Sequence, residues 1–489
     1  MVCSGRKRVG VQGLVRAGVA AVLLPGLALL VPGQASGGGF ELPDNGARAV
    51  GRGSAFTVRA DDLTAIAHNP AGLLRETGTR AQWSHNVVHA PMQFTRQPTT
   101  LPAKPLPKGA DPLAPTQNQT PWFALGGMLM AATDFGMKDW AFAAGIYGPS
   151  AAGHQEWPVS GGQRYMLTGL DVLLVYYSAA IAHGRKDHWG VGLTLQAAHQ
   201  LQTELKLVVD AFNGEDLSPY YNPNDVEATI TLSAPPVPTA ILGGWWRPAP
   251  WLELGASGRV LPVRMKATGN IALANTPTGS QFTQAQLEVE GGAARLTLII
   301  PPTARLGARY RHMDGETERF DVEFNFVYEA WSMLKEYKVE LDGDIKLFAK
   351  QQAPDVIIAK NWKDTLSARL GGTYNLPAQP VSISAGAFYE TGAVPDNYTH
   401  LDFPSFDRTG VSAGVKARVG KVDLDLSYSH VFQEDRVVDE AFGKVFQQRP
   451  ISPCPCQGPG TTMYDGVPAN AGTFESSFDV VGLSATIKF

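Results

Sequence analysis

Asn69, Pro70 and Ala71 are the residues whose order best predicts a specific chemical arrangement. The ring of Pro70 fixes its own φ angle and biases Asn69 towards an extended backbone. The Asn69 amide can then hydrogen-bond to neighbouring backbone groups and build a rigid corner. Such a corner could take part in the passage of a ligand, or it could only hold a turn in place. The residues support both interpretations equally.

Arg164, Lys206 and Arg369 are three cations that could each bind a carboxylate head group through charge-assisted hydrogen bonds. The stronger interpretation is that these side chains pair with acidic residues or face water, as charged residues in a protein interior usually do. Three aspartates are available as partners, namely Asp171, Asp423 and Asp425.

Catalytic and metal-binding patterns are weak in this sequence. It has no P-loop, no His-Glu-x-x-His and no EF-hand spacing. Cys454 and Cys456 lie in a Pro/Gly-rich stretch, and this pair alone is poor evidence for a metal site or a disulfide. The formal net charge of −4 comes without a basic stripe, which argues against nucleic acid as a partner. We therefore expect no catalytic residue, no metal and no cofactor.

The N-terminus has the three parts of a secretory signal peptide. Basic residues cluster at positions 6–8, an apolar run follows at 17–31, and small residues lead to a cleavage point after Ala35. The apolar run contains Pro25 and is shorter than the ~20 residues that a transmembrane helix needs. We therefore expect residues 1–35 to be a signal peptide.

Apolar and polar side chains alternate along many segments of the remaining chain. At the C-terminus the apolar set is Val481, Leu483, Ala485, Ile487 and Phe489, with small or polar residues between them. The same alternation runs through residues 319–329, 365–374 and 421–432. A period of two indicates strands with one apolar and one polar face.

A soluble β-sandwich would also alternate, but composition and strand length favour a membrane barrel. Charged residues make up 18% of the chain, below the roughly 25% of ordinary soluble domains. Many alternating segments are longer than the roughly five or six residues usual in globular sheets. Tryptophans also lie near the ends of predicted strands, as the aromatic girdles of a membrane barrel require; they are Trp122, Trp140, Trp189, Trp245, Trp246, Trp251 and Trp362.

The alternating segments predict an all-β fold, an antiparallel transmembrane β-barrel of about 14 strands in the bacterial outer membrane. The strands are expected near 79–95, 121–132, 138–148, 164–183, 186–210, 226–247, 251–268, 288–312, 317–335, 362–376, 380–390, 409–419, 421–436 and 474–489. Tight turns alternate with long connections between them. In such barrels the short turns face the periplasm and the long loops face the outside, so both termini are expected on the periplasmic side.

Residues 36–78 precede the first predicted strand and lack sustained alternation. A barrel of this size leaves a wide lumen unless something fills it. The segment is too apolar for a disordered periplasmic tail, since it contains Phe40, Leu42 and Phe56. We therefore expect it to form a hatch, a plug inside the barrel formed by residues 79–489.

Short motifs in a set order complete the pattern. The hatch contains Gly51–Phe56, Ala60–Leu63 and His68–Leu73, and the barrel contains Trp140–Pro149, Gln163–Tyr165, Pro301–Thr303, Trp331–Ser332, Asn361–Thr365 and Tyr389–Arg408. Together they resemble the FadL-type long-chain fatty-acid transport proteins of the outer membrane, whose hatch carries an Asn-Pro-Ala signature. The resemblance spans nearly all of the chain after residue 35, and the Pro-rich loops 96–120 and 437–473 depart from it.

The resemblance implies a passive path for hydrophobic compounds, most directly long-chain fatty acids. The path would run from an outer groove to a pocket beside the hatch and then out through the wall at a kinked strand. The residues expected along it are Asn69, Pro70, Ala71, Phe40, Leu42 and Phe56. Expected partners are these ligands together with outer-membrane lipids and lipopolysaccharide, and a monomer is expected. Transport of aromatic hydrocarbons, a general porin and a surface structural or adhesin barrel remain alternatives.

Overall fold

The computed structural model describes residues 45–97, 114–149, 153–210, 224–277, 281–346, 351–352, 355–447 and 468–489. Residues from Ser36 to Phe489 form one compact unit. Among the described residues, no helix has both the length and the hydropathy needed to cross a membrane.

The described strands join edge to edge into an antiparallel barrel of 14 wall strands, as the alternation predicted. In chain order the wall strands are β1 (Arg80–His89) with β2 (Met92–Arg96), β3 (Thr116–Gln117) with β4 (Trp122–Thr133), β5 (Trp140–Tyr147) with β6 (His154–Glu156), β7 (Gly169–Arg185), β8 (Trp189–Asp210), β9 (Asp225–Ala249), β10 (Leu252–Arg259) with β11 (Val263–Asn275), β12 (Val289–Ile300) with β13 (Thr303–Asp314), β14 (Thr317–Glu329) with β15 (Glu336–Ile345), β16 (Gln351–Gln352) and β17 (Val356–Ala359) with β18 (Thr365–Asn375), β19 (Val381–Glu390), β20 (Arg408–Val419), β21 (Val422–Gln433) with β22 (Arg436–Val438), and β23 (Gly472–Lys488).

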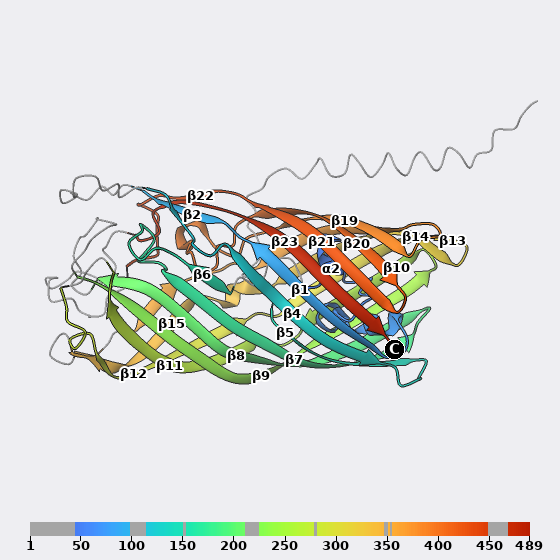
Figure 1. The fold of residues 1–489 in the computed structure, drawn as a ribbon, viewed down its shortest axis with the longest axis horizontal. Coiled ribbons are helices and arrows are strands. Elements are labelled where there is room, and N and C mark those ends of the chain that lie inside the picture. The colour runs from blue at the N-terminus through green and yellow to red at the C-terminus, as the bar shows by residue number, and fades with distance from the viewer. Residues whose placement is uncertain are drawn as a thin grey trace, which may run out of the picture. The chain divides into compact units, whose positions relative to one another are not determined.

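The barrel closes because its last strand pairs with its first. Strand β23 lies antiparallel to β1 from Arg80 opposite Lys488 to His89 opposite Asp479. Strand β1 pairs on its other edge with β4, and β23 pairs on its other edge with β21 (Figure 1). Closure leaves neither terminal strand as an open edge, which is what a lipid environment requires.

The two faces of the wall follow the predicted alternation. On β14, Phe324 and Phe326 are 49% and 40% exposed on the outside, whereas Glu323 and Asn325 between them are buried in the lumen. An apolar exterior over a polar interior is the pattern of a membrane barrel. Phe489, at the end of β23, also lies on the exposed face.

The tryptophan prediction is correct for five of the seven residues. Trp122, Trp140, Trp189, Trp246 and Trp251 are exposed. The prediction is wrong for Trp245 and Trp362, which are both buried. Trp245 has the inward register of β9 and lies under the Arg75 guanidinium, while Trp362 follows β17 and packs on Trp331 with ring centroids 5.1 Å apart.

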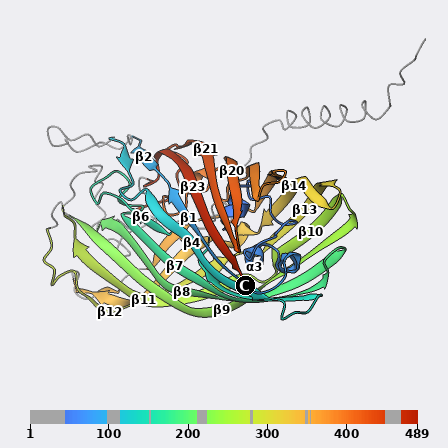
Figure 2. The same ribbon diagram turned by 45° about the vertical axis from the view of Figure 1, so that its right-hand side comes forward.

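Residues 45–78 lie within the ring of strands. They contain α2 (Ala47–Val50), α3 (Ala65–His68) and the 3-10 helix η2 (Pro70–Arg75). Helix α2 contacts β20, β21 and β23, and η2 contacts β5, β7, β8 and β9 on the other side of the ring. Contacts with both sides mean that this segment fills the lumen, as the short blue helices in Figure 2 show. We refer to residues 45–78 as the hatch.

Candidate functional site

The Asn69–Pro70 corner has the geometry that the sequence predicted. Asn69 is extended, with φ −156° and ψ 99°, and Pro70 begins η2. The Asn69 Nδ2 group donates to the carbonyl oxygen of Thr57 at 2.8 Å and to that of Gly244 at 3.1 Å, while Oδ1 accepts from the Ala71 amide at 3.2 Å. The side chain is completely buried and links two parts of the hatch to strand β9.

The barrel wall is shaped to receive this corner. Gly192 on β8 and Gly243 on β9 are direct cross-strand partners. A Cβ atom on Gly243 would lie 2.2 Å from Asn69 Oδ1, and one on Gly192 would lie 2.5 Å from the Ala71 nitrogen. Only glycine leaves room for the hatch backbone beside Gly192 and for the Asn69 side chain beside Gly243.

A second glycine pair receives the other side of the hatch. Gly371 on β18 and Gly386 on β19 are also cross-strand partners. A Cβ on Gly371 would lie 2.1 Å from the Arg52 carbonyl oxygen, and one on Gly386 would lie 2.2 Å from the Arg52 carbonyl carbon. The neighbouring Gly53 has φ +60°, in the left-handed region that favours glycine. The hatch is therefore held at two separate positions on the wall.

Ion pairs add a third attachment between hatch and wall. Arg52, Arg59 and Asp321 form its centre, with Arg52 Nη2 2.8 Å and Arg59 Nη1 2.6 Å from the Asp321 carboxylate. Glu323 Oε1 accepts a hydrogen bond of 2.7 Å from the Val58 amide. These charges are satisfied by several partners each, which offsets the cost of taking them out of water.

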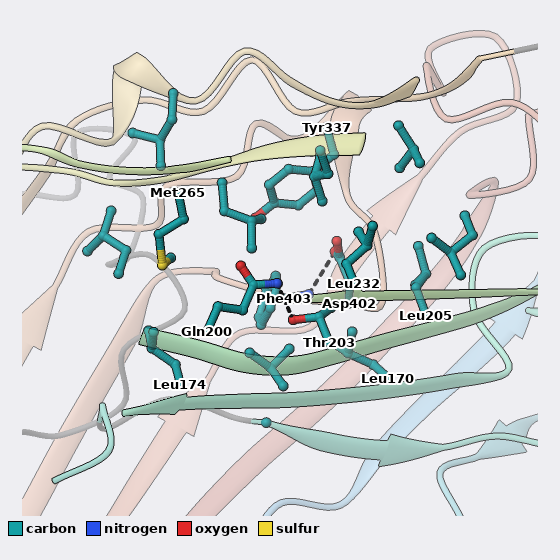
Figure 3. Close-up of a pocket in the computed structure, with 18 of the residues that line it drawn as sticks. Leu170, Leu174, Gln200, Thr203, Leu205, Leu232, Met265, Tyr337, Asp402 and Phe403 are labelled. Carbon is teal, nitrogen blue, oxygen red and sulfur yellow. Dashed lines mark hydrogen bonds between the residues drawn. The ribbon is translucent and has the colours of Figure 1, made fainter. Parts of the chain in front are cut away.

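Above the hatch the wall encloses an apolar cavity (Figure 3) with about 970 Å³ of empty space, counting its mouth. Its lining includes Leu170, Val172, Leu174, Leu205, Ile230, Leu232, Met265, Leu296, Leu298, Val339 and Ile358. Leu63 and Ile66 of the hatch belong to the same buried apolar cluster as Leu174 and Ile230, so the hatch and the cavity wall share one apolar core. The aliphatic lining suits the apolar part of a hydrophobic ligand.

The cavity arises because the alternation reverses in the outer part of the barrel. On β9, Ile230 and Leu232 point inward and are buried, while Thr231 and Ser233 are exposed. This order is the opposite of that on β14. The reversal is the one sequence signal that could have located the cavity, but the prediction did not use it.

A buried ionic cluster lies at the edge of the cavity. Asp402 lines the cavity and contacts Lys360 Nζ at 2.6 and 2.7 Å and His400 Nδ1 at 2.9 Å. Burial alone would raise the pKa of Asp402, but His400 and Lys360 outweigh it and hold that pKa well below the usual range. Burial lowers the pKa of Lys360, against the opposing effect of Asp402. The sequence prediction did not include these residues.

The three cations predicted as head-group contacts are not among the residues that line the cavity. Arg164 pairs with Asp225 at 2.9 Å and Arg369 pairs with Glu390 at 3.1 Å, both buried. Lys206 is 41% exposed and pairs with Glu204 at 2.7 Å.

The prediction that these cations pair with acidic residues is correct, but their direct partners are not the three named aspartates. Only Asp171 contributes a favourable charge near one of them, Lys206. Asp425 pairs with Arg48 at 3.2 Å, Asp423 with Lys416 at 3.0 Å, and Asp171 with His154 at 2.5 Å.

The remaining predicted hatch residues divide into two groups. Phe56 is completely buried and meets His68 edge to face, with ring centroids 5.6 Å apart. Phe40 and Leu42 lie outside the described residues, as do Cys454 and Cys456.

One stretch matches the Gly-x-Ser-x-Gly pattern of hydrolases, Gly410 to Gly414. In hydrolases the serine stands on a sharp turn between a strand and a helix. Here Ser412 lies within β20 and its Oγ is 2.8 Å from Ser429 Oγ. The match therefore reflects a small-residue strand packed near the hatch.

Residues 28–455 match the protein family described as outer membrane protein transport protein (OMPP1/FadL/TodX). A putative outer membrane protein of Neisseria meningitidis is 22% identical over 198 residues, 40% of this chain and 38% of the relative. A 47 kDa outer membrane protein of Pasteurella multocida is 25% identical over 116 residues, 24% of this chain and 25% of the relative. The chain thus spans well under half of the length of these curated relatives.

Solved structures share the fold over nearly the whole chain. A FadL homologue of Pseudomonas aeruginosa is 17% identical with a TM-score of 0.71, covering 92% of this chain and 100% of that one. The toluene transporter TodX of P. putida is 13% identical with a TM-score of 0.61, covering 92% and 99%. The toluene transporter TbuX of Ralstonia pickettii is 14% identical with a TM-score of 0.60, covering 92% and 100%.

Proposed function

The chain belongs to the OMPP1/FadL/TodX family of outer membrane transport proteins, and on that basis we propose that it carries hydrophobic compounds, most directly long-chain fatty acids, across the outer membrane. The observation that most strongly supports this function is the aliphatic cavity above the hatch. Burial of an acyl chain is worth up to about 0.8 kcal/mol per methylene. Partial burial of a long chain therefore supplies enough free energy for micromolar capture without an energy source.

The pairing of the wall supports a lateral exit near β5. Strand β5 ends at Tyr147, opposite Met128, whereas β4 continues from there to Trp122. On the other side β5 pairs with β7 only as far as Tyr176, and β6 pairs with β7 from residue 171 outward. Among the described strands, residues 173–175 of β7 therefore have no ladder partner on the β5 side. Leu174 of this stretch lines the cavity, so the break in the ladder lies beside the cavity.

Lys360 is a head-group candidate only for a carboxylate that displaces Asp402. It is bound to both oxygens of Asp402, and the Asp402 carboxylate, rather than Lys360, lines the cavity. Arg164 and Arg369 are bound to other carboxylates and remain less direct proposals. The hatch corner of Asn69, Pro70 and Ala71, with Phe56, is the proposed gate beneath the cavity.

Uptake measurements test this proposal. Cells with and without the protein are given labelled oleate or labelled toluene, and Leu232→Trp is compared with Leu242→Trp. Leu232 lines the cavity, whereas Leu242 lies on the same strand with its side chain 49% exposed on the outer face. We expect oleate uptake that depends on the protein and falls only in the Leu232 variant. Uptake of toluene alone would favour an aromatic cargo, and nanosiemens ion conductance would overturn the proposal in favour of a general porin.

A further inference from the structure

The cavity contains one buried polar group that its surroundings leave unsatisfied. Gln200 is completely buried in the lining, and its Nε2 donates to Thr203 Oγ1 at 2.8 Å. Its Oε1 has no hydrogen-bond partner. A buried acceptor without a partner is costly, so it indicates a group that a ligand or water satisfies.

The wall is built irregularly around this side chain. The ladder between β8 and β9 shifts register on both sides of Gln200, between Ala198 and Gln200 and between Gln200 and Thr203. Pro235 and Pro236 stand beside Ala234, the cross-strand partner of Gln200, and their missing N–H groups cannot extend the ladder. Bulges of this kind redirect a side chain, here into the lumen.

Other polar atoms in the lining are few. Figure 3 shows the Gln200 amide and the Tyr337 hydroxyl both directed into the cavity, with Thr203 beside Gln200. Asp402 is the charged residue in the lining, and it is already bound to Lys360. The remaining side chains are almost all aliphatic.

We propose that the cavity binds long aliphatic molecules that carry an uncharged hydroxyl group, and that Gln200 Oε1 accepts the hydrogen bond from that hydroxyl. This proposal rests on the proposed transport of hydrophobic compounds and adds long-chain alcohols to the fatty acids proposed there as ligands. A ligand hydroxyl carries the hydrogen that the Gln200 Oε1 acceptor lacks.

Other classes of ligand do not satisfy the Gln200 Oε1 acceptor. An ionised carboxylate has no hydrogen to donate to Gln200 Oε1. An alkane or an arene leaves the acceptor buried and unsatisfied, which disfavours binding. A site built to hydrogen-bond a hydroxyl discriminates against the analogue that lacks it, because its own polar group then goes unpaired.

The test compares ligands of equal chain length, 1-hexadecanol and hexadecane, both labelled. Uptake into cells is measured for the wild type, for Gln200→Leu and for Gln202→Leu. Gln202 is an exposed residue on the same strand, so it controls for the chemical change. Folding of each variant is checked by its heat-dependent shift on a gel. Native mass spectrometry of the purified full-length protein measures ligand retention directly.

We expect the wild type to favour the alcohol over the alkane by about tenfold, which corresponds to one hydrogen bond. Gln200→Leu should remove that preference while alkane uptake persists, and Gln202→Leu should change neither. If a folded Gln200→Leu variant keeps the alcohol preference, or if the wild type shows none, the hydroxyl proposal is wrong while transport stands. If neither ligand depends on the protein for uptake or retention, the transport proposal itself fails.

Discussion

Gly192 and Gly243 face each other across β8 and β9, and together they form the recess that receives the Asn69–Pro70 corner. Neither residue shows its role when the sequence is read along one strand. Their function appears only when the two strands pair and the hatch lies against them. Trp245, next on the inward face of β9, donates from Nε1 to the Ala71 carbonyl at 3.1 Å and secures the same corner.

Gly243→Ala should displace the hatch from its position against β8 and β9. The added Cβ would lie 2.2 Å from Asn69 Oδ1 and 2.9 Å from Pro70 Cδ, and the hydrogen bonds of the Asn69 side chain leave it little room to relax. Overpacking of this kind costs about 1–3 kcal/mol. We expect larger single-channel conductance and greater sensitivity to bulky antibiotics. Gly244→Ala is the matched control, because its Cβ would come no closer than 3.3 Å to the Gly190 carbonyl oxygen. Equal conductance in the two variants would show that the recess does not hold the hatch.

Asn69→Ala should loosen the corner without distorting the wall. The variant leaves the Thr57 and Gly244 carbonyls without their donor, a local cost of about 1–3 kcal/mol. We expect faster hydrogen exchange in residues 57–75 and altered oleate uptake, with the barrel strands unchanged. Normal uptake with faster exchange would mean that the corner is structural and takes no part in the passage of ligand.

Lys360→Met should destabilise the outer loops that surround the cavity. It leaves Asp402 buried with His400 as its remaining ionic partner. Removing one member of a buried ion pair typically costs about 3–5 kcal/mol. Lys363→Met, at an exposed neighbouring position, controls for the change of residue type. We expect greater proteolysis at residues 391–407 in the first variant only, and similar digestion of both would refute a role for the pair.

The sequence predicted the barrel well because the alternation is a local signal that each strand repeats. The two faces of β14 and β23 and the extended Asn69 all follow from spacing and backbone preference. The candidate site was predicted less well because it depends on pairing between distant segments. From the sequence alone, Arg164 and Arg369 are candidates to bind a ligand carboxylate. In the fold, Asp225 and Glu390 already pair with them. Gln200 became visible as a candidate only through the register shifts that place it in the cavity.

Asp407 should make the outer end of β20 sensitive to pH. Burial, together with the nearby carboxylates of Glu434 and Asp396, raises the pKa of Asp407 to about 6, although the Tyr389 hydroxyl and Arg436 act in the opposite direction. Because the folded pKa lies above the ordinary value near 4, the folded state holds a proton that the unfolded chain releases between about pH 4 and 6.

Stability should therefore fall as pH rises through this window, in contrast to an ion-paired aspartate. Asp407→Asn keeps the shape of the side chain and removes the titration. The two carboxylate oxygens of Asp407 accept hydrogen bonds from the Tyr389 hydroxyl at 2.8 Å and from the Gly392 amide at 3.5 Å. The asparagine side chain keeps one of these two acceptor oxygens. Hydrogen exchange of residues 391–407, measured from pH 4 to 7 and corrected for the intrinsic rate, should show protection that declines in the wild type and stays level in the variant. Parallel pH profiles for the two proteins would exclude Asp407 as the titrating group.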